Sequence, residues 1–299
     1  MPVATAFAPC QITGFFTIQD KAKNPLRVGS TGAGVNLEEG VTTTVSVTEA
    51  SRSRTRITLN GNILPNPVVS KEVVRQYLHR DGRTWNVRVS HSCELPIGCG
   101  YGTSGAGALS LSFSLNQVLG EPLTSFEAAA VAHQAEVTTK SGLGTVTSVF
   151  FGGVLVRLTP GSPGLARVTK TPISDSSRVV SGSLGPLPTR TALSNRRFAN
   201  RVNTCGSGLV QMFRRQSNDT GFLLISRRFA DCLGSASPRL KGLFRLGDEF
   251  GVVFSMMMIG ESGFTIVSGR MVEEAARLMR VAGFVPRISR IANEGARLV

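Results

Sequence analysis

The sequence predicts a globular protein of about two domains that mixes strands and helices without repeating the strand–helix–strand unit. The chain has 299 residues, which corresponds to about two domains at roughly 150 residues each. Hydrophobic residues make up 41% of the chain and charged residues 17%, a balance that supports a buried core and argues against disorder. Two consecutive helices are expected after a glycine-rich loop, and this order argues against a sheet built from repeated βαβ units.

The N-terminal region is expected to be mostly β-structure. Residues 3–18 are apolar and rich in strand-forming types, and we expect Ala8-Pro9-Cys10 to turn a first strand into a second one at Ile12–Ile18. A glycine-dense loop is expected next, at Gly29–Gly34. Alternating apolar and polar residues then predict two further strands and a tight turn. These are Thr42–Thr48, Arg54–Leu59 and the turn Asn60-Gly61.

Helices and strands follow each other less regularly in the rest of the chain. Thr124–Glu127 has the Thr-x-x-Glu pattern of a capping box, which predicts a helix that starts at Ser125. The predicted helices are Val68–His79, a helix from about Ser104 to Leu119, Ser125–Lys140 and Met271–Val281. The predicted strands are Trp85–Ser90, Ser148–Leu158 and Phe250–Ile259, with a closing hairpin at Phe284–Ile291 and Ala296–Val299. Proline and glycine between Thr159 and Pro172 fit a domain boundary.

The basic charge of the chain suits anionic ligands more than it suits nucleic acid. Lysine and arginine number 33 against 19 acidic residues, which gives a formal charge of +14. Six of these bases are lysine and 27 are arginine, the residue that makes bidentate contacts with phosphate and carboxylate. The bases are scattered, and one Trp and two Tyr provide few platforms for base stacking, so a solvated basic surface is the favoured interpretation.

No segment of the sequence predicts a membrane span or a secretory signal. The longest nearly apolar run, Phe250–Ile259, is about half of a bilayer span. The N-terminus lacks a basic segment followed by a long apolar one. We therefore expect a cytoplasmic protein without a membrane partner. The oligomeric state stays open, with a homodimer as one candidate.

The cysteines do not form a metal-binding pattern. The chain has five of them and no Cys-x-x-Cys pair, which argues against a zinc site. Buried free thiols are the expected state, and a disulfide between distant cysteines stays open. The five are Cys10, Cys93, Cys99, Cys205 and Cys232.

The segment Pro96–Ala108 carries the strongest indication of function. Five glycines lie between residues 98 and 107, far more than a simple turn requires. The helix that is expected to begin near Ser104 directs its free N–H groups and its positive dipole end into this loop. These features predict a phosphate cradle, in which the Ser104 hydroxyl contacts a phosphate oxygen or its Mg²⁺.

Three better-known motifs fit this segment poorly. No G-x-x-x-x-G-K-[ST] sequence is present, which excludes a P-loop. Gly100-x-Gly102-x-x-Gly105 matches the dinucleotide fingerprint, but His91–Ile97 separates it from the preceding strand, and a helix follows where a second strand should. Gly102–Ala106 lacks the final glycine of the G-x-S-x-G hydrolase motif.

The order of several motifs resembles the GHMP small-molecule kinase superfamily, and within it the archaeal pantoate kinase family. Pro96-x-Gly98-x-Gly100-x-Gly102-x-Ser104-Gly-Ala106 follows an N-terminal Ala8-Pro9 and precedes a late Gly260-Glu261 turn. Three more segments match the narrower family. They are Gly29-Ser30-x-Gly32-Ala33-Gly34-Val35, Ala132-His133-x-Ala135-Glu136-Val137 and Ser141-Gly142-Leu143-Gly144. The resemblance covers the whole chain, with most of it in the N-terminal half.

The resemblance implies an α+β fold of two domains, residues 1–160 and 161–299, with ATP and an acidic substrate in the cleft between them. It implies transfer of the γ-phosphoryl group of ATP to the primary hydroxyl of pantoate, which yields 4-phosphopantoate for coenzyme A synthesis. A GHMP-type kinase of shikimate, homoserine or mevalonate is the alternative. A basic nucleic-acid-binding protein on the same fold is a second alternative.

The resemblance also implies roles for individual residues. Ser104 and Glu136 would hold Mg²⁺, whereas a surface pair of Glu136 with Lys140 is the other interpretation. The family pattern is Gly-Leu-Gly-Asp, but Thr145 follows Gly144 here, and threonine cannot act as a carboxylate base. The triphosphate would be wrapped by Pro96, Gly98, Gly100, Tyr101, Gly102, Thr103, Ser104, Gly105 and Ala106.

A substrate with a carboxylate requires a cation or a group of N–H donors in its site. Arg27, just before the glycine-dense segment, is the first candidate for this cation, and Arg197 is the second. Gly32 and Gly34 are the expected substrate-binding glycines of that segment.

Overall fold

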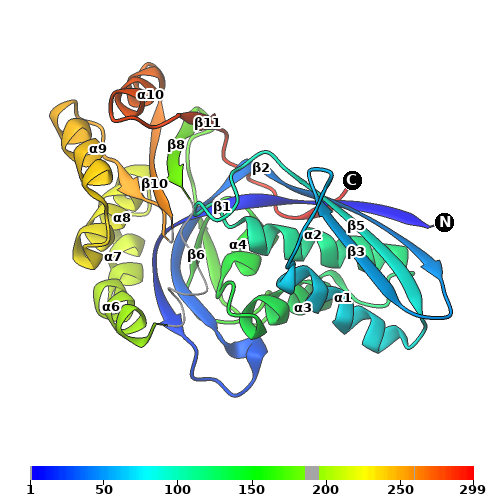
Figure 1. Cartoon of the computed structure of the whole chain (residues 1–299). Helices are drawn as coiled ribbons and strands as arrows, with labels where there is room; N and C mark the ends of the chain where they lie inside the picture. Colours follow the sequence, from blue (N-terminus) through cyan, green and yellow to red (C-terminus); the bar gives the residue numbers. More distant parts are fainter. Residues whose placement is uncertain (1, 186–194, 259) are drawn as a thin grey trace.

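The computed structural model describes residues 2–185, 195–258 and 260–299, and it confirms the α+β class (Figure 1). The strands are β1 (Val3–Gln19), β2 (Gly29–Glu49), β3 (Arg54–Leu59), β4 (Asn62–Ile63), β5 (Trp85–Cys93), β6 (Val154–Arg157), β7 (Val168–Thr171), β8 (Ser177–Gly185), β9 (Ser255–Met256), β10 (Glu261–Ser268), β11 (Arg287–Ser289) and β12 (Arg297–Leu298). The helices are α1 (Val68–Asp81), α2 (Thr103–Val118), α3 (Ser125–Thr138), α4 (Thr145–Phe151), α6 (Arg196–Gly206), α7 (Leu209–Arg215), α8 (Asp219–Leu233), α9 (Pro238–Glu249) and α10 (Met271–Val281).

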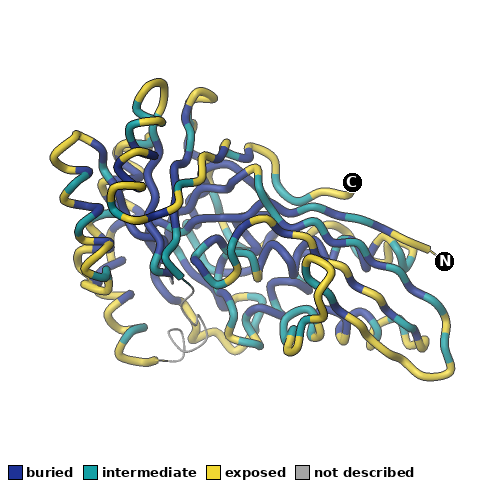
Figure 2. Tube along the Cα trace, turned by 45° about the horizontal axis from the view of Figure 1, so that its top comes forward, coloured by how far each residue is buried: buried dark blue, intermediate teal, exposed yellow. Residues whose placement is uncertain are grey.

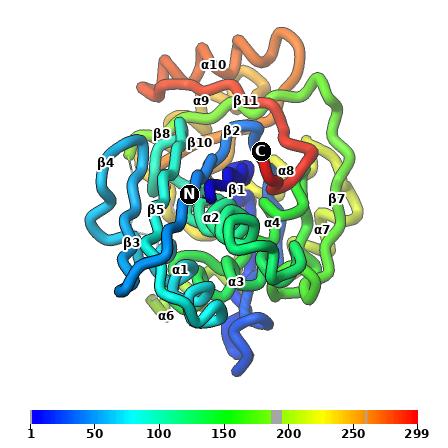
Figure 3. The backbone as a smooth tube through the Cα atoms, turned by 90° about the vertical axis from the view of Figure 1, so that its right-hand side faces the viewer, coloured from blue at the N-terminus to red at the C-terminus, as the bar shows by residue number. Residues whose placement is uncertain are grey.

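Two sheets organise these elements. The larger sheet has the order β12-β1-β2-β5-β3-β4, and β6 joins it through β2 and carries β7. The smaller sheet has the order β11-β8-β10-β9. Helix α2 packs directly on β1 and β2, with α1 and α3 on its outer side (Figure 3). Helices α8–α10 pack on the smaller sheet, whereas α6 and α7 pack on β1 and β2. Exposed residues concentrate on the outer helices and loop tips (Figure 2).

A continuous antiparallel pair, β1 with β2, replaces the turn and the loop that were expected near the N-terminus. The expected turn at Ala8-Pro9-Cys10 is wrong, because Pro9 pairs with Gly40 and the register shifts between Pro9 and Cys10. Proline cannot donate to the ladder, so it is accommodated at this irregularity inside the strand. The expected loop at Gly29–Gly34 is also wrong, because these residues form the start of β2.

Glycine in these two strands reflects the close approach of other atoms. A Cβ at Gly14 would lie 2.2 Å from Oγ of Ser226, so α8 packs directly on the backbone of β1. A Cβ at Gly34 would lie 1.7 Å from Nε2 of Gln11. Glycines that look like strand breakers in the sequence therefore make room for side chains from other elements.

The segment that was expected as one strand, Ser148–Leu158, divides into a helix and a strand. Helix α4 ends before Gly152 and Gly153, which have φ of 75° and 74°, and β6 begins at Val154. The β-branched and aromatic residues of α4 favour a strand locally. Burial of Val146 and Val149 in a helix that packs on α2 and β1 overrides this preference.

The other predicted elements of the first half are confirmed to within a few residues. The capping box of α3 is present, with Thr124 Oγ1 accepting from the N–H of Glu127. Asn60 and Gly61 join β3 to β4 with φ of 50° and 82°. The confirmed elements are α1, α2, α3, β3, β5 and the part of β2 at Thr42–Thr48.

The second half contains four consecutive helices, α6–α9, that the sequence did not reveal. Phe213 and Phe222 on α7 and α8 pack on Phe15 of β1, with ring centroids 5.9 and 6.2 Å apart. The strand β1 therefore extends from the larger sheet into the core of the second half. Cys205 of α6 and Cys232 of α8 form a disulfide. The free cysteines Cys10, Cys93 and Cys99 are buried, as expected.

The C-terminal predictions require correction. The expected hairpin is wrong, because β11 pairs with β8 and β12 pairs with β1. The strand expected at Phe250–Ile259 reduces, in its described part, to β9 at Ser255–Met256. The main strand is β10, which begins at Glu261, directly after a bend at Gly260, where the Gly260-Glu261 turn was expected. Both β7 and β12 come from beyond residue 160 yet pair within the larger sheet, and the domain division at 160 stays a prediction.

Candidate active site

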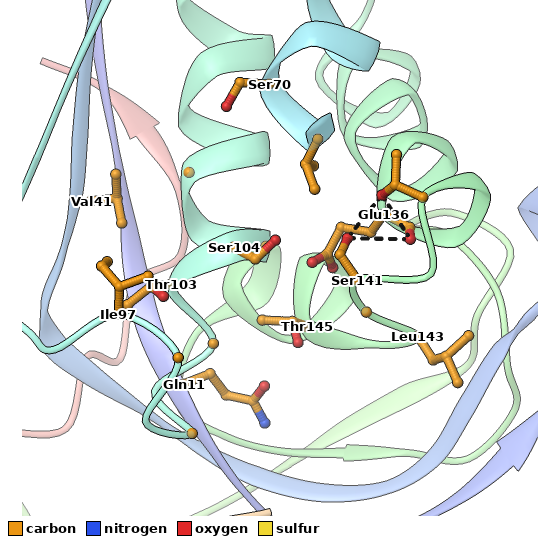
Figure 4. A pocket seen from close by; sticks show the side chains of 18 of the residues that line it. Gln11, Val41, Ser70, Ile97, Thr103, Ser104, Glu136, Ser141, Leu143 and Thr145 are labelled. Atoms are coloured by element: carbon orange, nitrogen blue, oxygen red, sulfur yellow. Dashed lines mark hydrogen bonds between the residues drawn. The ribbon is translucent and has the colours of Figure 1, made fainter. Parts of the chain in front are cut away.

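A cavity of about 470 Å³ lies where the N-terminus of α2 faces the end of α3 and the start of α4 (Figure 4). The strands β1, β2 and β6 form its floor, and Met258, between β9 and β10, lines it from the second half of the molecule. The cavity therefore lies where both halves of the chain meet. The polar lining residues at this end are Gln11, Thr13, Ser30, Thr103, Ser104, Glu136, Thr139, Ser141, Thr145 and Arg157.

The glycine loop forms one wall of the cavity. Gly98, Gly100 and Gly102 have φ of 77°, 91° and 64°, in the left-handed region that costs other residues about 1–3 kcal/mol. The first backbone bond of α2 runs from the N–H of Ala106 to the carbonyl of Gly102, at 3.1 Å. The N–H groups of residues 103–105 precede this bond, so they have no partner within the helix. They and the positive end of the helix dipole suit an anion.

The smaller sheet supports this loop from the other side. The hydroxyl of Ser262 donates to the carbonyl of Cys99 at 2.8 Å. The hydroxyls of Tyr101 and Ser181 are hydrogen-bonded at 3.1 Å. A Cβ at Gly260 would lie 2.5 Å from the Cys99 carbonyl oxygen. The shape of the glycine loop therefore depends on both halves of the molecule.

Glu136 on α3 is a buried carboxylate at the cavity wall. Its side chain is 2% exposed, and burial raises its pKa to about 7, against the opposing influence of the Ser104 side chain and the Val146 N–H. A Cβ at Gly142 would lie 2.5 Å from Oε2 of Glu136, so glycine provides room beside the carboxylate. The surface pair with Lys140 is wrong, because Glu136 is buried and makes no ion pair within the described ranges.

Thr145 occupies the first position of α4, against the cap of α2. A Cβ at Gly102 would lie 2.8 Å from Cγ2 of Thr145, and a Cβ at Gly105 would lie 2.7 Å from the same atom. Figure 4 shows Thr145 below Ser104 and Glu136. The structure therefore brings Ser104 and Glu136, the expected Mg²⁺ ligands, together with Thr145, which occupies the position of the family's aspartate.

Arg157 on β6 is a cavity residue that the sequence analysis missed. It is 2% exposed, and its Nη1 donates to Oγ of Ser148 at 2.6 Å. Its Nε is buried and has no partner among the described residues. Burial lowers the pKa of Arg157 to about 10, so the guanidinium stays charged at neutral pH. A buried cation without an opposite charge reduces the stability of the fold unless a bound anion pairs with it.

One sequence feature could have pointed to this residue. Arg157 ends the apolar run Val154–Val156, and a charged residue is rare at a strand position that is buried on both faces. A chain with 27 arginines hides this feature when residue type alone is considered.

Several predicted site residues lie outside the cavity. Arg27, in the 3₁₀ turn Pro25–Arg27, and Arg197, on α6, are exposed and do not line it. Gly32 and Gly34 are buried in β2, where Ser30 is the nearby lining residue. The remaining three are part of the loop or of α2 but do not line the cavity. These are Pro96, Tyr101 and Ala106.

The other end of the cavity is mostly apolar and lies beside α1 and β5. His91 is its main polar side chain, hydrogen-bonded to Ser70 at 3.1 Å and to Thr43 at 2.8 Å. Burial lowers the pKa of His91 to about 4, so the ring is neutral at physiological pH. The apolar lining residues are Val41, Leu59, Leu64, Pro67, Val68, Val69 and Ile97.

The part of the chain that the structure describes contains neither a membrane-spanning helix nor a preformed group of metal-ligating side chains. No helix within residues 2–185, 195–258 and 260–299 is long and apolar enough to cross a membrane. No three His, Cys, Asp or Glu side chains in those ranges converge as a metal-ligand group.

Comparison with known proteins relates this architecture to enzymes. Residues 68–153 match the family model described as the GHMP kinases N terminal domain. The chain is 31% identical over 281 residues to a pantoate kinase of Thermococcus kodakarensis, covering 92% of this chain and 91% of that protein. It is 28% identical over 278 residues to a pantoate kinase of Methanocaldococcus jannaschii, covering 92% and 96%. A solved structure described as a phosphotransferase related to the CoA biosynthesis pathway matches with a TM-score of 0.90 at 27% identity, over 99% of this chain and 98% of that chain.

The two sheets, the glycine loop and the cavity beside it define a small-molecule kinase of the GHMP class. The sequence identity to the pantoate kinases extends over nine-tenths of the chain, and it identifies a family within this class. The chain belongs to the pantoate kinase family, which confirms the resemblance seen in its motifs.

Proposed function

We propose that this protein transfers the γ-phosphoryl group of ATP to the primary hydroxyl of pantoate, giving 4-phosphopantoate for coenzyme A synthesis. One observation carries the proposal: a glycine loop suited to phosphate and a buried, unpaired Arg157 line the same cavity. A kinase of a hydroxy acid requires both features, a place for the triphosphate and a cation for the carboxylate.

ATP would lie along the length of the cavity. Its phosphates would accept from the N–H groups at residues 103–105, which have no partner within the helix. Its base would enter the apolar end beside α1, where a neutral His91 leaves the pocket uncharged.

The residues present fit a magnesium ion. Glu136 and Ser104 offer a carboxylate and a hydroxyl oxygen, the donor types that Mg²⁺ takes from proteins while phosphates and water complete its shell. A cation beside Glu136 would stabilise the ionised form that burial disfavours. The bound ion would neutralise charge on the phosphate oxygens.

Arg157, in place of Arg27 or Arg197, would bind the pantoate carboxylate. Its free Nε and Oγ of Ser30 both lie close to Gly144. A Cβ at Gly144 would be 2.8 Å from this Nε and 2.3 Å from that Oγ. The guanidinium and the Ser30 hydroxyl can then donate to the same carboxylate.

Phosphoryl transfer would proceed without a carboxylate base at position 145. The bond between the acceptor oxygen and the γ-phosphorus forms as the bond from that phosphorus to the bridging oxygen breaks, and ADP leaves. The acceptor proton passes late to the transferred phosphoryl group or to water. A loose transition state tolerates this, because positioning and charge neutralisation supply most of the catalysis.

The test is phosphoryl transfer by the purified protein. ATP, Mg²⁺ and pantoate are supplied, and ADP release and 4-phosphopantoate are measured, with shikimate, homoserine and mevalonate as parallel acceptors. We expect product with pantoate, and loss of most activity in Ser104→Ala. ADP release with another acceptor and not with pantoate would mean that this other acceptor is the substrate. No transfer to any acceptor, together with salt-dependent binding of nucleic acid and no binding of ATP, would overturn the kinase function.

A further inference from the structure

Gln11 on β1 presents an unsatisfied hydrogen-bond acceptor to the cavity. Its side chain is 1% exposed, and its Oε1 is buried without a partner among the described residues. Its Nε2 donates to Oγ1 of Thr13 at 3.2 Å and to the carbonyl of Ile12 at 3.4 Å. That carbonyl can only accept, so the amide nitrogen has to face it and Oε1 has to face elsewhere. Figure 4 shows the amide inside the cavity, below Thr145.

The chemistry of this oxygen restricts its partner. An amide oxygen accepts a hydrogen bond and cannot donate one. Phosphate and carboxylate oxygens of the bound substrates carry no proton to donate at neutral pH, so they cannot satisfy it. The partner has to carry an N–H or O–H group, and ATP carries such groups only on its ribose and base, away from the γ-phosphate. Pantoate, the proposed acceptor, has hydroxyls and no ammonium group.

The backbone of Gln11 lies beside the glycine loop, and its side chain lines the cavity there. The N–H of Gln11 donates to the carbonyl of Tyr101 at 2.9 Å. A Cβ at Gly102, the N-cap of α2, would lie 3.0 Å from the carbonyl oxygen of Gln11 and 2.8 Å from Cγ2 of Thr145. An attacking hydroxyl has to come within about 3–3.5 Å of the γ-phosphorus. Gln11 and Thr145 both lie beside the end of the glycine loop at the N-cap of α2.

We infer that Oε1 of Gln11 accepts a hydrogen bond from the attacking hydroxyl of the acceptor and so directs a lone pair of that hydroxyl toward the γ-phosphorus. The inference rests on the proposed kinase function. The amide does not take the proton, which passes to the transferred phosphoryl group or to water. Gln11 orients the nucleophile on the side opposite Thr145, where the family pattern has a carboxylate and this chain has none.

The first test is the substitution Gln11→Met, which keeps the length of the side chain and removes the amide. We expect kcat/KM for pantoate to fall about 10–100-fold, while the Kd for ATP changes less than about 2-fold. Gln76→Met is the matched control. Gln76 is also buried with an unpartnered Oε1 and an engaged Nε2, but it lies on α1 and does not line the cavity. Its substitution should leave both constants unchanged.

The second test replaces the attacking –CH₂OH group of pantoate by –CH₃ and compares binding of the two ligands in the presence of a non-hydrolysable ATP analogue. The wild type should prefer pantoate about 10-fold, and Gln11→Met should lose this preference. Should Gln11→Met fail to fold, Gln11→Asn, which keeps the amide but withdraws its oxygen, serves in both measurements.

Two outcomes would overturn the inference: kcat/KM for pantoate within about 2-fold of the wild type, or a preference for pantoate that survives the substitution. A wild type that neither binds ATP nor transfers phosphate refutes the proposed function instead. An active wild type with an unaffected Gln11 variant refutes only the role of Gln11.

Discussion

Glu136 and Arg157 are buried charges that make no ion pair within the described part of the chain. Removing a charge from water without an opposite charge beside it reduces the stability of the fold. Both side chains line the same cavity, so bound ligands can provide what the protein does not. The free protein should therefore be less stable than its complex with substrates.

Glu136 gives the fold a pH dependence of defined sign. Burial raises its pKa from 4.5 to about 7, so between these values the folded state holds a proton that the unfolded chain has lost. Stability should fall as pH rises through this range, by up to about 3 kcal/mol above pH 7. In metal-free buffer, the Tm of Glu136→Gln should exceed that of the wild type by a margin that grows from pH 5 to pH 8. Parallel Tm curves, as expected for the exposed Glu273→Gln control, would contradict this.

Arg157 is the candidate for the carboxylate site that the structure indicates, whereas Arg197 is a candidate that the sequence indicated. In Arg157→Met, kcat/KM for pantoate should fall about 100-fold, since a charge-assisted pair to the substrate is lost. The Kd for ATP should change little. Arg197→Met removes the same charge from the exposed surface of α6 and should leave the kinetics unchanged. Steady-state kinetics of both variants test which arginine binds the carboxylate. An effect confined to Arg197→Met would assign the carboxylate site to Arg197 instead of Arg157.

At the scale of elements, sequence patterns predicted the glycine loop and its helix better than the scaffold around them. The glycine loop, the capping box and three helices of the first half are encoded locally, so local rules find them. Gly14 and Gly34 depend on atoms that arrive from distant segments, and no local rule contains those atoms. Gln11 and Arg157 were missed for a related reason, because packing alone reveals which of their atoms lack partners.

The disulfide between α6 and α8 should stabilise the second half without affecting catalysis. It closes a loop with a sequence separation of 27 residues and lies away from the cavity lining. In the double variant Cys205→Ala/Cys232→Ala we expect a loss of about 2–4 kcal/mol, read as a lower Tm, with kcat and both KM values unchanged. A reductant should lower the Tm of the wild type similarly and leave the variant unaffected. Equal Tm values for variant and wild type would refute the stabilisation.

At the scale of the whole molecule, the glycine loop is held by contacts from both halves of the chain. Tyr101 in the loop and Ser181 in the smaller sheet share a buried hydrogen bond of 3.1 Å. Tyr101→Phe removes only the hydroxyl, so it should loosen the loop and raise the KM for ATP about 5-fold with little change in kcat. Tyr77→Phe is the matched control, because Tyr77 makes an equivalent bond to Ser112, at 3.0 Å, inside the first half.

A double-mutant cycle makes this prediction specific. Ser181→Ala should raise the KM for ATP to a similar extent, and combining it with Tyr101→Phe should add little further. Additive effects of the two substitutions, or an equal effect of Tyr77→Phe, would mean that the bond does not position the loop.

The return of β12 to the outer edge of β1 also bears on how the molecule is made. Residues Ala6 and Phe7 pair with Leu298 and Arg297, which are synthesised long after them. This edge of β1 therefore stays unpaired until β12 has been synthesised. The larger sheet is thus completed only after the smaller sheet and its helices have been made.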